Sequence, residues 1–218
     1  MDEIDREIFY DNMRHKMLTG KLTQSQVEGT EVILDFWESL PIDISSTFEE
    51  NWNIRIIEWL AYILATTYHE TAHTMQPLDE GGSNAYFRRY EDNKKLARRL
   101  GNDRKGDGAK FHGRGYVQIT GRANYTKMSK IVREYYPDAP DFTIDPSAVK
   151  IPKYAVLILF YGMFQGTFTG KALKHYIGDP DKGQFSSFYH ARKIVNGLDR
   201  AKDIERYAEI ALHALTEQ

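Results

Sequence analysis

The sequence predicts a mainly α-helical protein with one small β element. Apolar residues recur at helical spacing through most of the 218-residue chain. A polar segment at residues 79–113, rich in Gly, Asn and Asp, interrupts this pattern, and a short run that alternates as a strand does follows it. The length suits one substantial core or a compact domain with a small lobe, and no repeat, low-complexity tract or Pro/Gly/Ser linker divides it. We therefore predict one domain over residues 1–218.

The first third of the chain is predicted to contain three helices. Apolar spacing indicates a first helix near residues 4–9, and Thr23 with Gln26 matches a capping box that opens a second helix. The strongest prediction is a third helix over residues 54–75, which Pro77 ends. The buried face of this helix is formed by Ile57, Leu60, Ile63, Leu64 and Thr67.

The rest of the chain is predicted as a loop, a strand and further helices. The polar segment 79–113 reads as a long loop with one short helix near residues 92–100, and loops of that length are usually functional or disordered. Residues 116–120 alternate in polarity, which predicts a short strand before a turn at Gly121. Helices are predicted near residues 123–135, 152–165, 186–195 and 199–216.

The composition is that of a soluble globular protein without disulfides. Cysteine is absent, hydrophobic residues make up 41% and charged residues 28%. The N-terminus is acidic and amphipathic, which does not match a signal peptide. The longest apolar stretch, within residues 54–67, is interrupted by Arg55 and Glu58 and is too short to span a bilayer. We therefore expect a protein that is made in a cytoplasm and does not insert into a membrane.

The net charge of −2 conceals an asymmetry along the chain. Residues 1–80 contain 5 Lys/Arg and 16 Asp/Glu, whereas residues 88–122 contain 11 Lys/Arg and 4 Asp/Glu. Such a basic segment marks either a polyanionic partner, such as nucleic acid or a bacterial envelope, or a solvated face. The segment contains no recognisable nucleic-acid module, so we do not expect a nucleic-acid partner.

One short motif matches a zinc-peptidase signature. His69-Glu70-Thr71-Ala72-His73 fits H-E-x-x-H, which on a helix places two imidazoles on one face with a Glu between them as general base. Glu91 and Asp92 lie close to where some zinc peptidases carry a third ligand. Against this reading, the turn-like run DEGGSN follows Pro77 and no clear second helix aims a ligand back.

The same segment also offers a pair of carboxylates. Glu70 is expected at a helix end and Glu91 beyond a polar loop, so a fold can bring them to opposite walls of a cleft. Glycoside hydrolysis needs such a pair, because one carboxylic acid protonates the leaving oxygen and one carboxylate activates water. A single Glu is usually a solvated surface charge, so the pair by itself leaves both readings open.

The surrounding runs resemble glycoside hydrolase family 19, the chitinase-like family that includes many phage endolysins. The resemblance is carried by LATTYHETAHTMQP and GDGAKFHGRGYVQITGRANY, and extends to KLTQSQVEG, RYEDNKKLARRLGN and IVNGLDR. It touches residues 5–212. It implies a lysozyme-like fold with a small β element beside the catalytic cleft, and metal-free, inverting hydrolysis of β-1,4 glycosidic bonds without a cofactor.

The resemblance implies a role for individual residues. Glu70 matches the general acid and Glu91 the general base, with Asp79, Glu80 and Asp92 competing for the second role. The other positions that it associates with the site are His69, Tyr116, Gln118, Thr120, Asn124, Tyr125, Asn196 and Arg200. Among these, Gln118 and Thr120 would hold the sugar and the water, Arg200 would join a charge network near the acid, and His69 would be a structural neighbour of the acid. For the two tyrosines, groove lining and core packing are equally expected.

The chemistry adds expectations about the surroundings of the two carboxylates. A proton donor calls for a partly apolar setting around Glu70, which a long hydrophobic helix would supply. A base that stays ionised suits Glu91 among the basic residues Arg88, Arg89, Lys94 and Lys95.

Departures from the family pattern favour one branch of it. Chitinases of the family commonly carry cysteines and longer surface loops, which this chain lacks, and its charged residues 88–110 are closer to phage lysins. We therefore expect a monomeric endolysin that waits in the host cytoplasm, cuts peptidoglycan, and contacts the anionic wall surface through residues 88–122. The alternatives are a chitinase of the same fold, a zinc metallopeptidase using His69 and His73, and a non-catalytic wall-binding relative. The sequence does not say whether the bond on the muramic acid or the glucosamine side is cut.

Overall fold

The computed structural model describes residues 4–16, 21–40, 56–178, 183 and 185–217. The protein is mainly α-helical with one small two-stranded antiparallel sheet, which confirms the predicted class at this level. The chain forms two compact units, Met1–Met75 with Phe160–Gln218, and Gln76–Leu159. One domain over residues 1–218 stays a prediction, and the two units are described separately below. No described helix is both long enough and apolar enough to cross a membrane.

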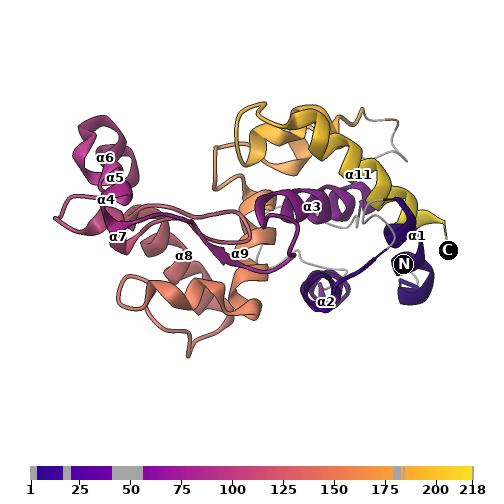
Figure 1. Ribbon diagram of the computed structural model, residues 1–218, viewed down its shortest axis with the longest axis horizontal. Coiled ribbons are helices and arrows are strands. Elements are labelled where there is room, and N and C mark those ends of the chain that lie inside the picture. Colours follow the sequence, from indigo (N-terminus) through magenta and orange to yellow (C-terminus); the bar gives the residue numbers. More distant parts are fainter. Residues whose placement is uncertain (1–3, 17–20, 41–55, 179–182, 184, 218) are drawn as a thin grey trace. The chain divides into compact units, whose positions relative to one another are not determined.

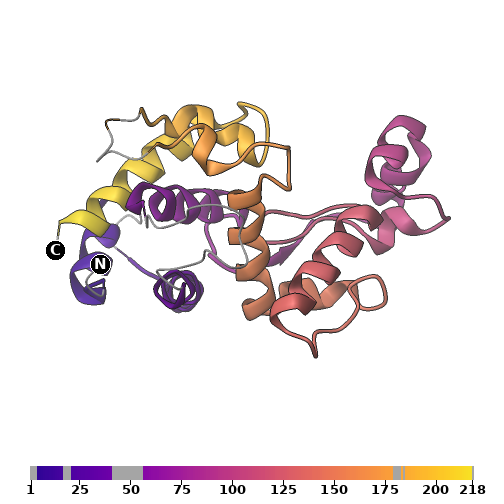
Figure 2. The same ribbon diagram turned by 180° about the vertical axis from the view of Figure 1, so that it is seen from behind.

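The first unit is built around helix α3 (Ile57–Glu70). Residues 59–68 of α3 are all buried, as expected for a helix that is covered on every side. Helix α11 (Ala201–Thr216) lies alongside α3, and α1 (Arg6–Lys16) packs on α11 (Figures 1 and 2). The unit is completed by α2 (Gln24–Ser39), the end of α9 (Pro152–Gln165), η2 (Leu173–His175), α10 (Phe188–Ala191) and η4 (Arg192–Ile194).

Local sequence signals explain α2 and its attachment to α1. The predicted capping box is present, because the Thr23 hydroxyl accepts from the Gln26 backbone N–H and the Gln26 side chain accepts from the Thr23 N–H. Arg6 of α1 then forms ion pairs with three carboxylates on one side of α2, those of Glu31, Asp35 and Glu38. This cluster fixes the two helices against each other within the first unit.

Helix α3 ends at Glu70, so the prediction of a helix over residues 54–75 is wrong at its C-terminal end. Residues 54 and 55 lie outside the described residues. The backbone N–H of His73 donates to the carbonyl of Tyr68 at 2.8 Å, a bond that closes a helix C-terminus. Ala72, His73 and Met75 then have φ values of 48°, 68° and 57°. Left-handed residues cannot continue a right-handed helix, so the chain leaves α3 directly after Glu70.

The second unit consists of short elements around a minimal sheet. Strand β1 (Leu78–Asp79) pairs antiparallel with β2 (Arg114–Gly115), with Leu78 opposite Gly115 and Asp79 opposite Arg114. Between the strands the chain forms α4 (Asn84–Phe87), α5 (Arg89–Asp92), α6 (Lys94–Leu100) and α7 (Asp107–Lys110). After them come α8 (Arg122–Tyr135), η1 (Pro146–Lys150) and residues 152–159 of α9. The predicted long loop is therefore largely helical, and α6 matches the one helix expected within it.

The strand predicted at residues 116–120 is replaced by a tight hairpin. Arg114 and Ile119 exchange backbone hydrogen bonds of 3.2 and 2.9 Å, and Gln118 between them has a φ of 55°. The residues at 116, 117 and 119 are buried on one turn rather than on one face of a strand. A loop that folds back on itself buries consecutive side chains. Alternating polarity indicates a strand and gives no sign of such a loop.

Candidate active site

Glu70, the predicted acid, ends α3 in the first unit. Its side chain is 18% exposed, and its Oε1 accepts a hydrogen bond from Nη1 of Arg192 at 2.5 Å. The Arg192 side chain is 2% exposed, and its Nε donates to the carbonyl of Asp199 at 2.9 Å. A buried ion pair is held in place when further hydrogen bonds satisfy the charged groups, as they do here for the guanidinium. The hydrophobic helix expected behind Glu70 is present, but the carboxylate itself is paired with an arginine.

Arg192 belongs to a segment that is fixed to α3. The hydroxyl of Tyr62 on α3 donates to the carbonyl of Ala191 at 2.8 Å in the buried interior. Burial raises the pKa of Tyr62, so this hydroxyl keeps its proton. The tyrosine therefore sets the position of η4, and with it that of the Arg192 guanidinium beside Glu70.

Arg192, and not the predicted Arg200, is the arginine beside Glu70. Arg200 is exposed, pairs with Asp203 at 3.5 Å, and has a left-handed φ of 57° at the start of α11. Arg192 is the arginine that contacts Glu70. Its signal in the sequence is faint: Arg192 and Lys193 lie next to each other between the apolar residues Ala191 and Ile194, and only Arg192 of the two is buried. Nothing in this run indicates which of the two basic residues has a buried partner, or what that partner is.

His69 and His73 do not form the zinc-binding arrangement. Because α3 ends at Glu70, the two histidines do not lie one turn apart on a helix, which the H-E-x-x-H site requires. The exposed His73 ring instead stacks on Tyr68, with centroids 4.2 Å apart. Burial lowers the pKa of His69, with the charge of Arg192 acting in the same direction against that of Glu70. Within the described part of the chain, no three His, Asp or Glu side chains are grouped to hold a metal ion.

Asn196 lies in the same unit as Glu70. It follows η4 and is exposed, and its Oδ1 accepts from the backbone N–H of Gly197 at 2.9 Å. Its side-chain amide N–H groups have no hydrogen-bond partner among the described residues, so they are open to a ligand.

Glu91, the predicted base, lies on α5 in the second unit. Its Oε2 accepts a hydrogen bond from the backbone N–H of Gly108 at 2.8 Å. Its Oε1 has no hydrogen-bond or ion-pair partner within the residues that the structure describes. A Cβ atom on Gly108 would lie 2.4 Å from the carbonyl oxygen of Phe87 and 3.4 Å from Glu91 Oε2, so only glycine fits here. Glu91 is thus anchored at one carboxylate oxygen and open at the other.

The turn that presents the Gly108 N–H is itself held by a buried ion pair. Asp107 accepts from Nε of Arg122 at 2.9 Å and also pairs with Nη2 of that arginine. It accepts as well from the backbone N–H of Arg104 at 3.1 Å. Burial alone would raise the pKa of Asp107, but the hydrogen bonds from Arg122 and Arg104 outweigh it and the pKa is lowered. The amide that anchors Glu91 therefore sits on a fixed support.

Two of the three carboxylates that compete for the role of base are fully engaged. Asp79 binds Arg114 at 2.8 Å, His112 at 3.3 Å, and Lys150. Burial raises the pKa of Asp79, but the hydrogen bond and the charge of Lys150 lower it by more. The net pKa therefore lies below the usual value. These contacts tie the minimal sheet to η1 and occupy both carboxylate oxygens.

Glu80 is engaged in the same way. Its Oε1 accepts from Arg89 at 2.8 Å and from the Tyr90 hydroxyl at 2.7 Å, and its Oε2 accepts from the Gly113 N–H at 3.0 Å. Asp92 is exposed at the end of α5 and is the competitor without such contacts among the described residues.

The expected basic surroundings of Glu91 are not formed as predicted. Arg89 pairs with Glu80, and its guanidinium lies 3.7 Å from the centre of the Tyr86 ring. Neither Arg89 nor the other basic residues expected around Glu91 forms an ion pair with it in the described structure. The contact to Glu91 comes instead from the backbone N–H of Gly108, and not from the side-chain cations that the sequence suggested.

The polar side chains of the hairpin donate hydrogen bonds to backbone carbonyls in and beside it. The Gln118 amide donates to the carbonyls of Leu78 at 3.1 Å and Gly115 at 2.9 Å. The Thr120 hydroxyl donates to the carbonyl of Gln118 at 2.9 Å, and the Asn124 amide to that of Thr120 at 2.7 Å. These donors shape the loop, so a contact with a ligand would use their acceptor atoms or the second amide N–H of Asn124.

Tyr116 and Tyr125 are core residues. Of the two predicted alternatives, core packing is therefore confirmed and groove lining is wrong. They are 1% and 0% exposed, respectively, and burial raises the pKa of each hydroxyl. The Tyr125 hydroxyl donates to the carbonyl of His112 and accepts from Nη1 of Arg114, each at 2.8 Å. Tyr125 therefore supports the hairpin from beneath.

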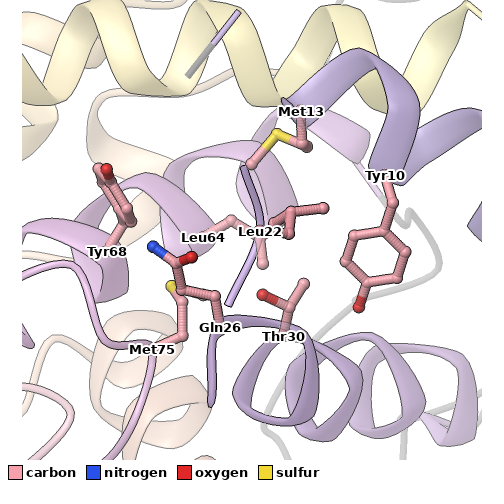
Figure 3. Close-up of a pocket in the computed structure, with 8 residues that line it drawn as sticks. All are labelled: Tyr10, Met13, Leu22, Gln26, Thr30, Leu64, Tyr68 and Met75. Carbon is pink, nitrogen blue, oxygen red and sulfur yellow. The ribbon is translucent and has the colours of Figure 1, made fainter. Parts of the chain in front are cut away.

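One pocket in the first unit is apolar and does not resemble an active site (Figure 3). It has room for about one water molecule. Its lining, from α1 to the turn after α3, consists of Tyr10, Met13, Leu22, Gln26, Thr30, Leu64, Tyr68 and Met75. None of these side chains is a carboxylate or a cation, so the pocket contributes to packing around the turn after Glu70.

Comparison with known proteins yields no match: no protein-family model fits the chain, and no curated protein matches it significantly. The functional assignment therefore depends on the residues described above.

Proposed function

We propose that the protein is an inverting glycoside hydrolase of lysozyme-like fold, similar to family 19, that cuts β-1,4 bonds of bacterial peptidoglycan as an endolysin. The observation that carries the proposal is the state of Glu91. Asp79 and Glu80 have both carboxylate oxygens engaged within their own unit, whereas Glu91 is anchored at Oε2 and open at Oε1. A general base needs this combination of a fixed orientation and a free acceptor.

The proposed step at the base begins with a water molecule. Oε1 of Glu91 accepts a proton from the water as the water oxygen attacks the anomeric carbon. The Gly108 N–H holds the other oxygen, so the carboxylate does not rotate while the proton moves. No metal is required, because the carboxylate itself activates the water.

The proposed step at the acid protonates the leaving group. Glu70 donates a proton to the glycosidic oxygen as the bond between that oxygen and the anomeric carbon breaks. Arg192 binds Oε1 of Glu70, and we therefore assign the transferred proton to Oε2. Water adds on the face opposite the departing sugar, so the new anomeric hydroxyl is inverted. Glu91 then releases the proton it accepted to solvent, and Glu70 takes a proton from solvent, which restores both groups.

Peptidoglycan is proposed over chitin because the chain lacks the cysteines and longer surface loops common in chitinases of the family, and its charged residues 88–110 are closer to those of phage lysins. The decisive experiment is mass spectrometry of peptidoglycan digests. New reducing sugar ends without new amino termini are expected. New amino termini instead would overturn the glycosidase in favour of the peptidase, and turnover of chitin oligomers without turnover of peptidoglycan would move the substrate to chitin.

Chelation separates the two chemistries independently. Dialysis against EDTA should leave wall lysis within about twofold, because neither proposed catalytic group is a metal ligand. If EDTA abolishes lysis and added zinc restores it, the protein is instead a zinc peptidase that uses His69 and His73.

A further inference from the structure

The cations of the basic segment 88–122 divide into two sets. Several are used inside the second unit, in the pairs Arg89–Glu80, Arg104–Asp103, Arg114–Asp79 and Arg122–Asp107. In contrast, four exposed cations on α6 form no ion pair or side-chain hydrogen bond within the described residues: Lys94, Lys95, Arg98 and Arg99. We call these four residues the α6 cationic face. Seven cations of the segment form no ion pair among the described residues, and α6 carries four of them; the others are Arg88, Lys105 and Lys110.

The helix that carries the α6 cationic face is capped at both ends and packed on its opposite side. The helical spacing of its residues places all four on one side of α6, while Ala97 and Leu100 on the other side are 8% and 9% exposed. The Asn93 side chain caps the helix at its N-terminus, and a left-handed Gly101 ends it. A Cβ atom on Gly101 would lie 2.9 Å from that of Ala123, so the end of α6 is packed tightly against α8.

The charges on this face oppose one another. Lys94 with Arg98 and Lys95 with Arg99 are like-charge pairs four residues apart, an arrangement that destabilises a helix. No carboxylate of the described chain offsets this repulsion. A bound anion would offset it, and the planar guanidinium groups of Arg98 and Arg99 suit a carboxylate, which they can bind through two hydrogen bonds.

We infer that the α6 cationic face binds the peptide-stem carboxylates of peptidoglycan, the glycan that the proposed reaction cuts. This inference rests on the proposed function for the identity of the polymer. Helix α6 directly follows α5 in the chain and packs against it, and α5 carries Glu91. A glycan strand whose bond reaches Glu91 therefore brings the groups attached to its neighbouring sugars close to α6. Chitin carries no such carboxylates.

The inference is tested by binding in the absence of turnover. The full chain with Glu70→Gln is incubated with purified peptidoglycan from which phosphate-containing polymers have been removed, and the bound fraction is measured by sedimentation. Adding Arg98→Gln and Arg99→Gln, or Lys94→Gln and Lys95→Gln, should weaken binding about tenfold, and added salt should weaken the parent towards the same level as charge screening increases.

A matched control removes the same charge elsewhere. Lys127 and Lys130 are exposed on α8 of the same unit and form no ion pair within the described residues, so Lys127→Gln with Lys130→Gln should leave binding unchanged. The α6 variants should melt at or slightly above the temperature of the parent, because they relieve repulsion. That measurement separates lost binding from lost folding.

The source of the anion is tested with modified walls. Chemical amidation of the stem carboxylates should lower parent binding to the level of the α6 variants. Unchanged binding by the α6 variants, an equal loss in the α8 control, or insensitivity to amidation would each overturn the inference. Tighter α6-dependent binding to anionic lipid vesicles or to duplex DNA would overturn it in favour of that partner. These binding results stand whether or not the wild-type chain releases reducing ends, so failure of the proposed function is seen separately.

Discussion

Oε1 of Glu70 and Nη1 of Arg192 lie 2.5 Å apart and link the end of α3 to η4 across 122 residues of sequence. Both side chains are largely buried, and the guanidinium is further held by the carbonyl of Asp199. The pair fixes the direction of the proposed proton donor, and it also makes each partner necessary to the other. An unpaired charge in such a place is costly.

We expect Arg192→Met to destabilise the first unit by about 3–5 kcal/mol, because it leaves the Glu70 carboxylate buried without a partner. The free energy of unfolding is measured by urea denaturation. Adding Glu70→Gln to Arg192→Met should recover a large part of the loss, since a neutral amide costs less to bury than a carboxylate. Strictly additive effects would show that the two side chains are not coupled. Arg200→Met is the matched control and should change stability by less than about 0.5 kcal/mol, as is usual for an exposed position.

Glu70→Gln and Glu91→Gln should each reduce peptidoglycan cleavage by about 10²–10⁴-fold, the contribution typical of general acid–base groups. Release of reducing sugar ends is the measurement. Asp92→Asn removes the same charge one residue along α5 and should leave the rate within about twofold, the small effect expected of an exposed carboxylate outside the mechanism. If Asp92→Asn abolishes cleavage while Glu91→Gln retains it, the base is Asp92. An active Glu70→Gln would refute the glycosidase mechanism.

Glu91→Gly should be partly rescued by azide. The substitution opens space beside the anomeric carbon, and a small anion can then attack without a general base. Nuclear magnetic resonance of the glycosyl azide should show inverted configuration, because inversion is the outcome when water or a substitute attacks directly. A product of retained configuration would indicate that a covalent intermediate forms on another carboxylate, and Glu91 would then not be the base of an inverting reaction.

Gly108→Ala should lower the catalytic rate by at least about tenfold, because the new Cβ displaces either the Phe87 carbonyl or the Glu91 carboxylate. Substrate affinity should change less than the rate, and azide should rescue Gly108→Ala poorly because the carboxylate still occupies the site. Gly81→Ala is the control, since a Cβ there meets no atom within 4 Å. An equal loss of rate in Gly108→Ala and Gly81→Ala, or a loss explained entirely by unfolding, would show that Gly108 does not position Glu91.

Acid should destabilise the second unit partly through Asp107. The folded-state pKa of this carboxyl lies below its unfolded value, so its ion pair with Arg122 contributes stability above about pH 3.8, and that contribution is lost as the pH falls through the folded pKa. Melting temperatures measured between neutral pH and about pH 2 should therefore fall less steeply in Asp107→Asn, which is already less stable at neutral pH. Parallel curves for the two proteins would show that Asp107 does not contribute to the acid transition.

The helices were predictable from the sequence because their signals are local. The capping box of Thr23 and Gln26 opens α2, and the apolar runs of α8, α9 and α11 match predicted helices to within a few residues. Spacing of three and four residues places side chains on one face whatever the rest of the chain does. The two candidate carboxylates also came from the sequence, through motif residues beside them, and their roles stay predictions.

The tertiary structure alone decided the partners of these carboxylates. Nothing in the sequence near Glu70 indicates Arg192, and nothing near Glu91 indicates the Gly108 amide. Only the tertiary structure shows which cations form ion pairs inside the second unit and which are exposed on α6. It also shows that α3 ends at Glu70, where left-handed residues follow that an apolar pattern does not reveal. Ion pairs and backbone contacts form between segments distant in sequence, and local periodicity carries no information about which distant groups will meet.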